Sequence, residues 1–271
     1  MEKSPELSNK TAETEEKIPL LDKIISESEK VPVTAEDTNY PSYEMRASPM
    51  GSISHLDEKE WKITRTDSFK DWFEGSKILD ENKEPLVVNT RSRFKKDEKF
   101  ELGTRQVLKI SEDSWGKKGV NNFGFFFSEA PNLFHYGPFI KKAFLNIKNP
   151  FDVSDLSSVS TFEEFKTKLL EYELPEDDIK KMEEEFLKWK KERNKLIHGS
   201  EKIPEGWIKN GWIDNQATYN YFDVGDGGKE VREILIKNGF DGLKINDLEG
   251  IAYVAFHPEQ ILVFENKKDT N

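Results

Sequence analysis

The chain has 271 residues, of which 35% are hydrophobic and 34% are charged, and its formal net charge is -11. This charge argues against a general nucleic-acid binder, because such proteins neutralise phosphates with an excess of Lys and Arg. The sequence has no cysteine, which excludes disulfides, thiolate zinc sites and a cysteine nucleophile. No apolar run has the length of a membrane span and no signal-peptide pattern opens the chain, so we expect a cytoplasmic protein.

Residues 1–60 are rich in Glu, Lys, Ser, Thr and Pro and contain one apolar cluster, at residues 18–25. A segment of this composition buries too little apolar surface to offset the entropy that it loses on ordering. We therefore predict a disordered acidic tail or linker over residues 1–60, and a disordered end over residues 267–271. The alternative for residues 18–25 is a short amphipathic helix that docks on a partner.

Regular structure is expected to begin at Trp61. Ser68 is the predicted N-cap of a short helix over residues 69–73, and Gly75 should end that helix. Beyond it we predict a hairpin with arms at residues 78–79 and 86–88, and then strands at residues 123–127 and 143–147.

A helical insert follows, which begins with the capping-box pattern of Thr161 and Glu164. Apolar residues recur at helical spacing on both sides of Pro175 and predict a hairpin of two helices over residues 161–198. A third helix is predicted over residues 229–238 with Gly239 as its stop, and strands at residues 243–245, 251–256 and 261–264. Strands first, helices in the middle and strands last favour the α+β class.

Four stretches of the chain together carry a resemblance to a known family. They are residues 65–73 with 80–88, residues 123–128 (Phe-Gly-Phe-Phe-Phe-Ser), residues 143–153, and residues 238–243 with 253–261. In this order they resemble the ADP-ribosyltransferase domain of polyvalent proteins, which phages and conjugative elements carry. The resemblance covers residues 61–266, which we therefore expect to form an ADP-ribosyltransferase-like α+β domain with split β-sheets and the helical hairpin as an insert.

The resemblance implies that NAD is the substrate and binds in a cleft between two small sheets. The bond between nicotinamide and ribose would break through an oxocarbenium-like state. An early strand would hold the ribose and the carboxamide, and an aromatic residue on a second strand would stack on the nicotinamide ring. A carboxylate on a late strand would support the developing positive charge.

On the early strand the family pattern is Tyr-His-Gly-Thr directly after two valines, where this chain has Asn-Thr-Arg-Ser. Thr90 therefore stands at the position of the histidine and Arg91 at that of the glycine. A threonine hydroxyl can bond a ribose, although it reaches less far than a histidine. We expect both residues at the cofactor site. Arginine serves on this strand in toxin-type transferases, but their Ser-Thr-Ser and paired-glutamate signatures are missing here.

The second motif agrees better with the family pattern. Phe126 is the predicted stacking residue, Gly124 would allow close backbone approach, and His135 or Tyr136 would form a second aromatic wall; we assign Tyr136 to the cofactor site. Core packing is the alternative for residues 125–127. Because side chains alternate along a strand, Phe126 should point away from the face that its two neighbours share.

The late-strand carboxylate is expected directly before Tyr253, where this chain has Ala252. Glu249, three residues earlier in a turn, is our candidate catalytic residue. The histidines are scattered without the spacing of metal ligands, and no metal is expected.

The resulting hypothesis is a protein of a phage or mobile element that transfers ADP-ribose from NAD to a host macromolecule, either a protein or a nucleic acid. The altered histidine and glutamate positions leave a second hypothesis open. In that reading the domain is catalytically degenerate and serves as a binding or structural module.

Overall fold

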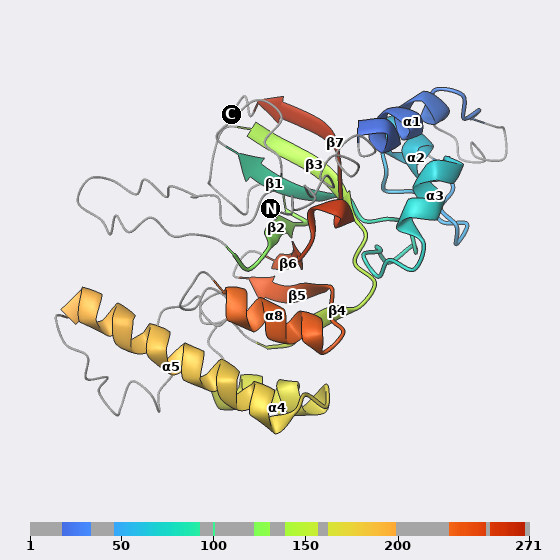
Figure 1. Cartoon of the computed structure of the whole chain (residues 1–271). Helices are drawn as coiled ribbons and strands as arrows, with labels where there is room; N and C mark the ends of the chain where they lie inside the picture. The colour runs from blue at the N-terminus through green and yellow to red at the C-terminus, as the bar shows by residue number, and fades with distance from the viewer. Residues whose placement is uncertain are drawn as a thin grey trace, which may run out of the picture. The chain divides into compact units, whose positions relative to one another are not determined.

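A computed structural model describes residues 18–33, 46–92, 100, 122–130, 139–156, 162–198, 228–247 and 250–268 (Figure 1). The chain divides into two units. The first comprises Met1–Glu74 with Asp80–Pro85, and the second comprises Gly75–Leu79 with Leu86–Asn271. The chain thus leaves the first unit at Gly75, re-enters it for residues 80–85 and leaves it again at Leu86.

The first unit contains three described helices, α1 (Ile18–Ser28), α2 (Glu58–Arg65) and α3 (Asp67–Phe73). Asp57 begins α2 with a capping box, because its carboxylate accepts from the backbone N–H of Glu60 while the Glu60 carboxylate accepts from the backbone N–H of Asp57. The cap of α3 is Thr66, whose hydroxyl accepts from the backbone N–H of Phe69 at 3.1 Å. The sequence-based choice of Ser68 as this cap is therefore wrong by two residues, and Ser68 lies inside the helix.

Helix α1 corrects the expected disordered tail over part of its length. It contacts both α2 and α3, and its Ile24 is fully buried. The carboxylate of Glu27 accepts hydrogen bonds from the hydroxyl of Ser68 at 2.8 Å and from its backbone N–H at 3.1 Å. The apolar cluster at residues 18–25 can order because α2 and α3 supply the surface that it needs, and the folded part of the chain begins well before Trp61.

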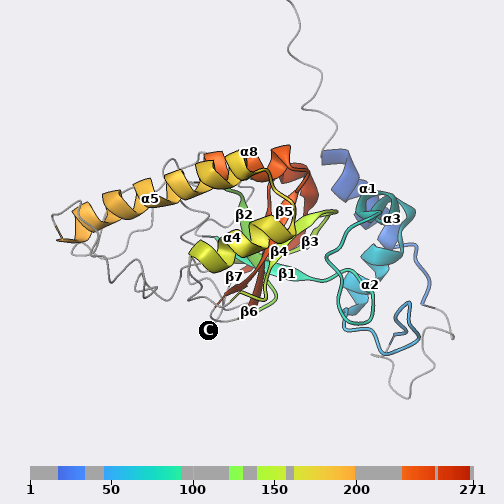
Figure 2. The same cartoon turned by 90° about the horizontal axis from the view of Figure 1, so that it is seen from below.

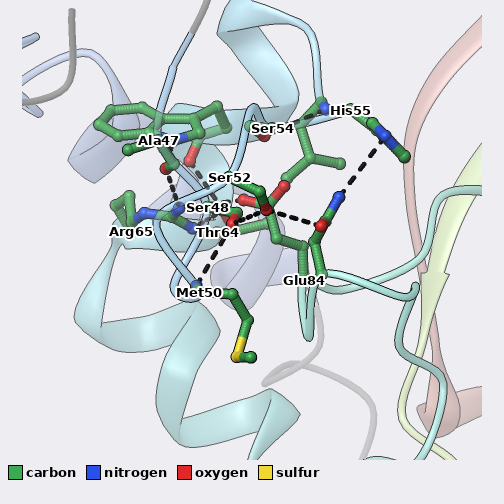
Figure 3. A network of polar contacts seen from close by, with 12 residues as sticks. Ala47, Ser48, Met50, Ser52, Ser54, His55, Thr64, Arg65 and Glu84 are labelled. Carbon is green, nitrogen blue, oxygen red and sulfur yellow. Dashed lines mark hydrogen bonds and ion pairs between the residues drawn. The ribbon is translucent and has the colours of Figure 1, made fainter. Parts of the chain in front are cut away.

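An ion pair between the half-buried Arg65 and the buried Glu84 connects the separate segments of the first unit (Figure 3). The Arg65 guanidinium donates to Glu84 at 3.1 Å and to the Ala47 carbonyl at 3.4 Å, and it lies 4.7 Å from the centre of the Trp61 ring. Glu84 is fully buried. A carboxylate without solvent is costly unless it is paired, so this contact fixes the 80–85 turn in the unit.

The second unit is built on a seven-stranded sheet with the order β4-β5-β6-β2-β1-β3-β7. Its strands are β1 (Val88–Ser92), β2 (Phe125–Ser128), β3 (Phe139–Leu145), β4 (Pro150–Val153), β5 (Gly242–Asp247), β6 (Gly250–Ala255) and β7 (Ile261–Lys268). β4 and β5 run parallel, and the remaining neighbours are antiparallel. The α+β class is confirmed. Strand β4 is not among the predicted strands. It begins at Pro150, which has no N–H to donate and is tolerated on this strand at the edge of the sheet.

The expected division into two small sheets is corrected, because the described strands belong to one hydrogen-bonded sheet. The join between its halves is nevertheless narrow. Among the described residues, β1 and β2 pair only at Asn89 and Ser128, whereas β1 pairs with β3, and β2 with β6, along their full lengths. The sequence favoured a split, and in the part of the chain that the structure describes the two halves pair at this one position.

Helices α4 (Phe162–Glu171), α5 (Glu176–His198) and α8 (Lys229–Lys237) lie beside the β4–β5 end of the sheet (Figures 1 and 2). The expected helical hairpin is confirmed. On its predicted faces the structure buries Phe165, Leu169, Ile179, Met182 and Phe186, whereas Phe162 is half-buried. The helix-side core combines these helices with one face of β4, β5 and β6, and includes Phe165, Leu169, Ile179, Met182, Val231, Leu235, Phe151, Leu243 and Val254. A second cluster, the opposite-face core, lies on the other side of the sheet and includes Val88, Phe125, Phe127, Ala143 and Tyr253.

Gly239 ends α8 as predicted. It adopts a positive φ of 88°, and the backbone N–H of Phe240 returns to the carbonyl of Leu235 at 3.0 Å. Glycine adopts this left-handed backbone conformation without steric strain. The hydrogen bond from the Phe240 N–H satisfies a helix carbonyl that would otherwise lack a partner. Phe240 is thereby buried in the helix-side core.

Replacing Ile24 by Ala should loosen α1, because a cavity at a fully buried isoleucine costs about 2–4 kcal/mol. Limited proteolysis with thermolysin should leave residues 18–33 intact in the wild-type chain and cut them in the variant. Asp22→Ala, at an exposed position of the same helix, is the matched control. Rapid cleavage of residues 18–33 in the wild type would show that α1 does not dock.

Asp178 of α5 should stabilise the contact with α8. Its buried carboxylate accepts from the Lys237 ammonium at 2.8 Å and from the Asn238 amide at 2.9 Å, and these bonds lower the pKa of Asp178 against the effect of burial. Asp178→Ala should cost about 1–3 kcal/mol at pH 7 in urea unfolding followed by circular dichroism.

The pH dependence of this stabilisation follows from the lowered pKa. A carboxyl whose pKa is lower in the folded state contributes above its unfolded pKa of about 4 and loses that contribution as the pH falls through the folded value. The difference between wild type and Asp178→Ala should therefore shrink below about pH 4. An equal difference at pH 7 and pH 3 would contradict this role of the ion pair.

Candidate functional site

A row of polar side chains crosses one face of the sheet, the face of the opposite-face core. Register pairs connect Asp152, Lys244, Tyr253 and Phe127 on one half of the sheet, and Thr90, Lys141 and Asn266 on the other half. Phe127 and Thr90 are the next positions after the pair that joins β2 to β1. The flanking positions on one side of the row, such as Val88, Ala143 and Ala255, are apolar. The row, which we call the polar band, therefore borders an apolar surface on that side, whereas its other side includes Ser92 and Asn246.

The centre of this band combines a buried lysine with aromatic rings. Lys141 is only 5% exposed, and its ammonium lies 5.6 Å from the centre of the Phe100 ring. That ring also packs edge-on against Phe125 and at a tilt against Phe127, with centroid distances of 5.3 and 5.8 Å. Attraction to the ring face offsets part of the desolvation of the lysine. Phe100 itself is only half-buried.

Tyr253, a member of the band, forms a hydrogen bond with Glu129, which lies beside the band. The hydroxyl of Tyr253, on β6, donates to the carboxylate of Glu129, directly after β2, at 2.8 Å. Tyr253 is buried, whereas Glu129 is exposed. Burial, together with the charge of Glu129 and this hydrogen bond, raises the pKa of Tyr253. The phenol therefore stays protonated and remains a donor at neutral pH.

The backbone around Glu129 is fixed from both neighbouring strands. Its N–H donates to the carbonyl of Ile251 on β6 at 3.3 Å, and its carbonyl accepts from the side-chain amide of Asn89 on β1 at 3.1 Å. The same amide reaches the carbonyl of Ser128 at 3.5 Å. Asn89 is buried, so its bonds to two successive carbonyls reinforce the narrow join between the halves of the sheet.

At the edge of the band, Lys244 donates to Asp152 at 3.0 Å. Burial opposes ionisation of Asp152, but hydrogen bonds from Ser154 and from Lys244 outweigh it and lower the pKa of this carboxyl. The Asp152 carboxylate is thus already bound by the ammonium of Lys244 and by Ser154, directly after its own strand.

The structure brings together only some of the residues that the sequence assigns to the cofactor site. Thr90 belongs to the polar band, whereas its neighbour Arg91 points to the other face, because successive residues of a strand alternate. Phe126 faces away from Phe125 and Phe127, as predicted, and packs against the helix-side core. Glu249, Tyr136 and the alternative His135 lie outside the described residues.

Gly124 has a different partner from the one expected. A Cβ atom at this position would lie 2.5 Å from Cγ1 of Val254 and 2.7 Å from the carbonyl oxygen of Ala255. The close approach that requires glycine is therefore made by the neighbouring strand β6. Packing against β6 is one reason for glycine at this position, and the expected approach to a cofactor stays a prediction.

Sequence reasoning missed Lys141, Tyr253 and Glu129 as members of a site. Their shared face depends on the register of strands that lie far apart in the chain. Alternation within residues 251–256 could have put Tyr253 on a face with Ala255, but the sequence does not reveal which residue of β2 lies beside it.

Within the described residues, no group of three or more His, Cys, Asp or Glu side chains could hold a metal ion. No helix in that part of the chain is long and apolar enough to cross a membrane. The chain matches no protein-family model, no curated protein and no solved structure.

Replacing Gly124 by Ala should destabilise the second unit by about 1–3 kcal/mol, because the added methyl group would overlap Val254 and the backbone of Ala255. Chemical unfolding of both proteins measures this difference. Unchanged stability combined with loss of ligand binding would instead mean that Gly124 makes room for a ligand.

Proposed function

We propose that the second unit is an ADP-ribosyltransferase-like domain of a phage or mobile element. It would bind NAD over the strands β1, β2 and β6 and transfer the ADP-ribose group to a host protein or nucleic acid. The proposal rests on the resemblance of the sequence to that family, together with the arrangement of these strands.

The observation that carries the proposal is the adjacency of β6, β2 and β1 at the centre of the sheet. The chemistry implied by the resemblance needs groups from an early, a second and a late strand at one place. In the sequence these strands begin at Val88, Phe125 and Gly250, so they are far apart in the chain. Their adjacency in the sheet is what such a shared site requires.

Two groups on the face of the polar band suit the cofactor. The hydroxyl of Thr90 can bond a ribose hydroxyl, and the half-buried Phe100 ring offers a flat apolar surface for nicotinamide. Phe126 was the sequence-based candidate for stacking, but it faces the helix-side core. Phe100 takes over that role in this proposal.

The second candidate is a noncatalytic module that binds NAD or ADP-ribose. Ala252 favours it, because this residue stands where the family has its late-strand carboxylate. It also points to the face of Ser128 and Asn89, away from Thr90. Transfer of labelled ADP-ribose from NAD to proteins or nucleic acid of a lysate separates the two candidates.

Isothermal titration of NAD into the full-length protein tests the binding site. Thr90→Val keeps the shape of the side chain and removes its hydroxyl, so NAD affinity should fall about 5- to 10-fold, the value of one hydrogen bond. Arg91→Ala should leave affinity unchanged, because Arg91 lies on the other face of β1.

Thr167→Val, at an exposed position of α4, is the matched control for loss of a threonine hydroxyl. A weaker affinity in Arg91→Ala with normal affinity in Thr90→Val would move the site to the face of Phe126. Absence of NAD and ADP-ribose binding by the wild type would refute both candidate functions.

A further inference from the structure

The pair of Tyr253 and Glu129 has features of a built site. The hydrogen bond gives the buried Tyr253 phenol an acceptor, and it presents the carboxylate of an exposed residue 124 positions away in the chain. The backbone of Glu129 is held between β1 and β6 by the hydrogen bonds of its carbonyl and its N–H, and its carboxylate accepts from Tyr253. A single oxygen of Glu129 accepts the phenol, so the carboxylate can still act on a ligand.

We propose that Glu129 is the carboxylate that supports ribosyl transfer from NAD and that Tyr253 is its positioning residue. This inference rests on the proposed function of the second unit. It assigns the charge on which the reaction depends to the end of β2, in place of the late-strand position that Ala252 occupies.

The location of Glu129 suits this role. Its side chain points to the face of Thr90 and Phe100, as its contact with Tyr253 establishes. Residues two apart on one strand are separated by about 7 Å, so Glu129 lies roughly that far along the sheet from the polar band.

Other described carboxylates on the sheet suit it less well. Asp152 is on edge strand β4 and accepts from Lys244 at 3.0 Å. Glu265 of β7 lies opposite Lys142, on the face away from Thr90, and pairs with Lys267 at 2.8 Å. Glu129 combines the right face, a central strand and solvent exposure.

The chemical step then follows from the charge of Glu129. The bond between C1′ of the ribose and the nicotinamide nitrogen breaks, and its electron pair goes to the nitrogen, so that neutral nicotinamide leaves. The carboxylate stabilises the positive charge that develops at C1′ and O4′. An acceptor hydroxyl or water then forms a bond to C1′, and its proton passes to the carboxylate and from there to solvent.

Tyr253 acts on this step through Glu129. Its hydroxyl fixes the direction of the carboxylate, and a charge that is already oriented need not reorganise as the cation forms. Removing the hydroxyl should therefore slow turnover without changing substrate binding.

Release of nicotinamide from NAD, with water as acceptor, measures the step in the full-length protein. Glu129→Gln should lower kcat by about 100-fold or more, the usual effect of losing one aligned electrostatic group, while NAD affinity in titration changes little. Tyr253→Phe should lower kcat about 10-fold with unchanged KM, because the loss of a single orienting hydrogen bond is worth roughly a factor of ten.

Glu184→Gln, at an exposed position of α5, should retain the wild-type rate and is the matched control. Glu129→Asp keeps the charge but withdraws it by one methylene group, and it should retain more activity than Glu129→Gln. This ordering separates a catalytic role from damage to the fold, because both substitutions are made at the same exposed site.

The outcomes distinguish a failure of the Glu129 assignment from a failure of the proposed function. If the wild type binds NAD and releases nicotinamide, and Glu129→Gln keeps the full rate, the assignment of Glu129 is wrong while the proposed function stands. NAD binding without any release of nicotinamide overturns the assignment and favours the noncatalytic module. If the wild type binds neither NAD nor ADP-ribose, the proposed function itself fails.

Discussion

The narrow join between β1 and β2 is the constraint on which the arrangement of the second unit depends. Two halves of the sheet, each paired along whole strands, are connected through Asn89 and Ser128. The buried amide of Asn89 strengthens this connection by reaching the carbonyls of Ser128 and Glu129. Because the polar band crosses the sheet beside the join, a change there would alter the spacing of Thr90 relative to Tyr253. The fold and the candidate site therefore both depend on the pairing of β1 with β2.

The sequence predicts well those elements whose signals are local. The helices of the second unit repeat apolar residues such as Phe165 and Leu169 at helical spacing, and the structure buries them. Gly239 marks the end of α8 by its conformational freedom alone. Alternation likewise gave the orientation of Phe126. Each of these predictions depends on residues within about one or two turns of each other, so no knowledge of the tertiary structure is needed.

The remaining features depend on contacts between distant segments, which the sequence does not encode locally. Helix α1 is short and lies in a polar stretch of the sequence, so the sequence does not predict it as part of the fold. It becomes ordered through its contacts with α2 and α3. The sequence suggests that Gly124 makes room for a ligand, whereas the strand register places Val254 directly against it. Glu129 acquired significance in the same way, because strand pairing brings Tyr253 to its side. Register decides such contacts, and a shift of one residue would reverse every face.

The exchange of chain between the two units has a consequence for synthesis on the ribosome. Arg65 is made well before Glu84, yet Glu84 is its carboxylate partner in the finished unit. Helices α2 and α3 can emerge and begin to pack while this arginine still lacks that partner. The first unit can be completed only once residues 80–85 have left the exit tunnel, by which time the chain has already entered the second unit at Gly75. Folding of the first unit can therefore finish only after the synthesis of residues 80–85, which lie in the sequence between two segments of the second unit.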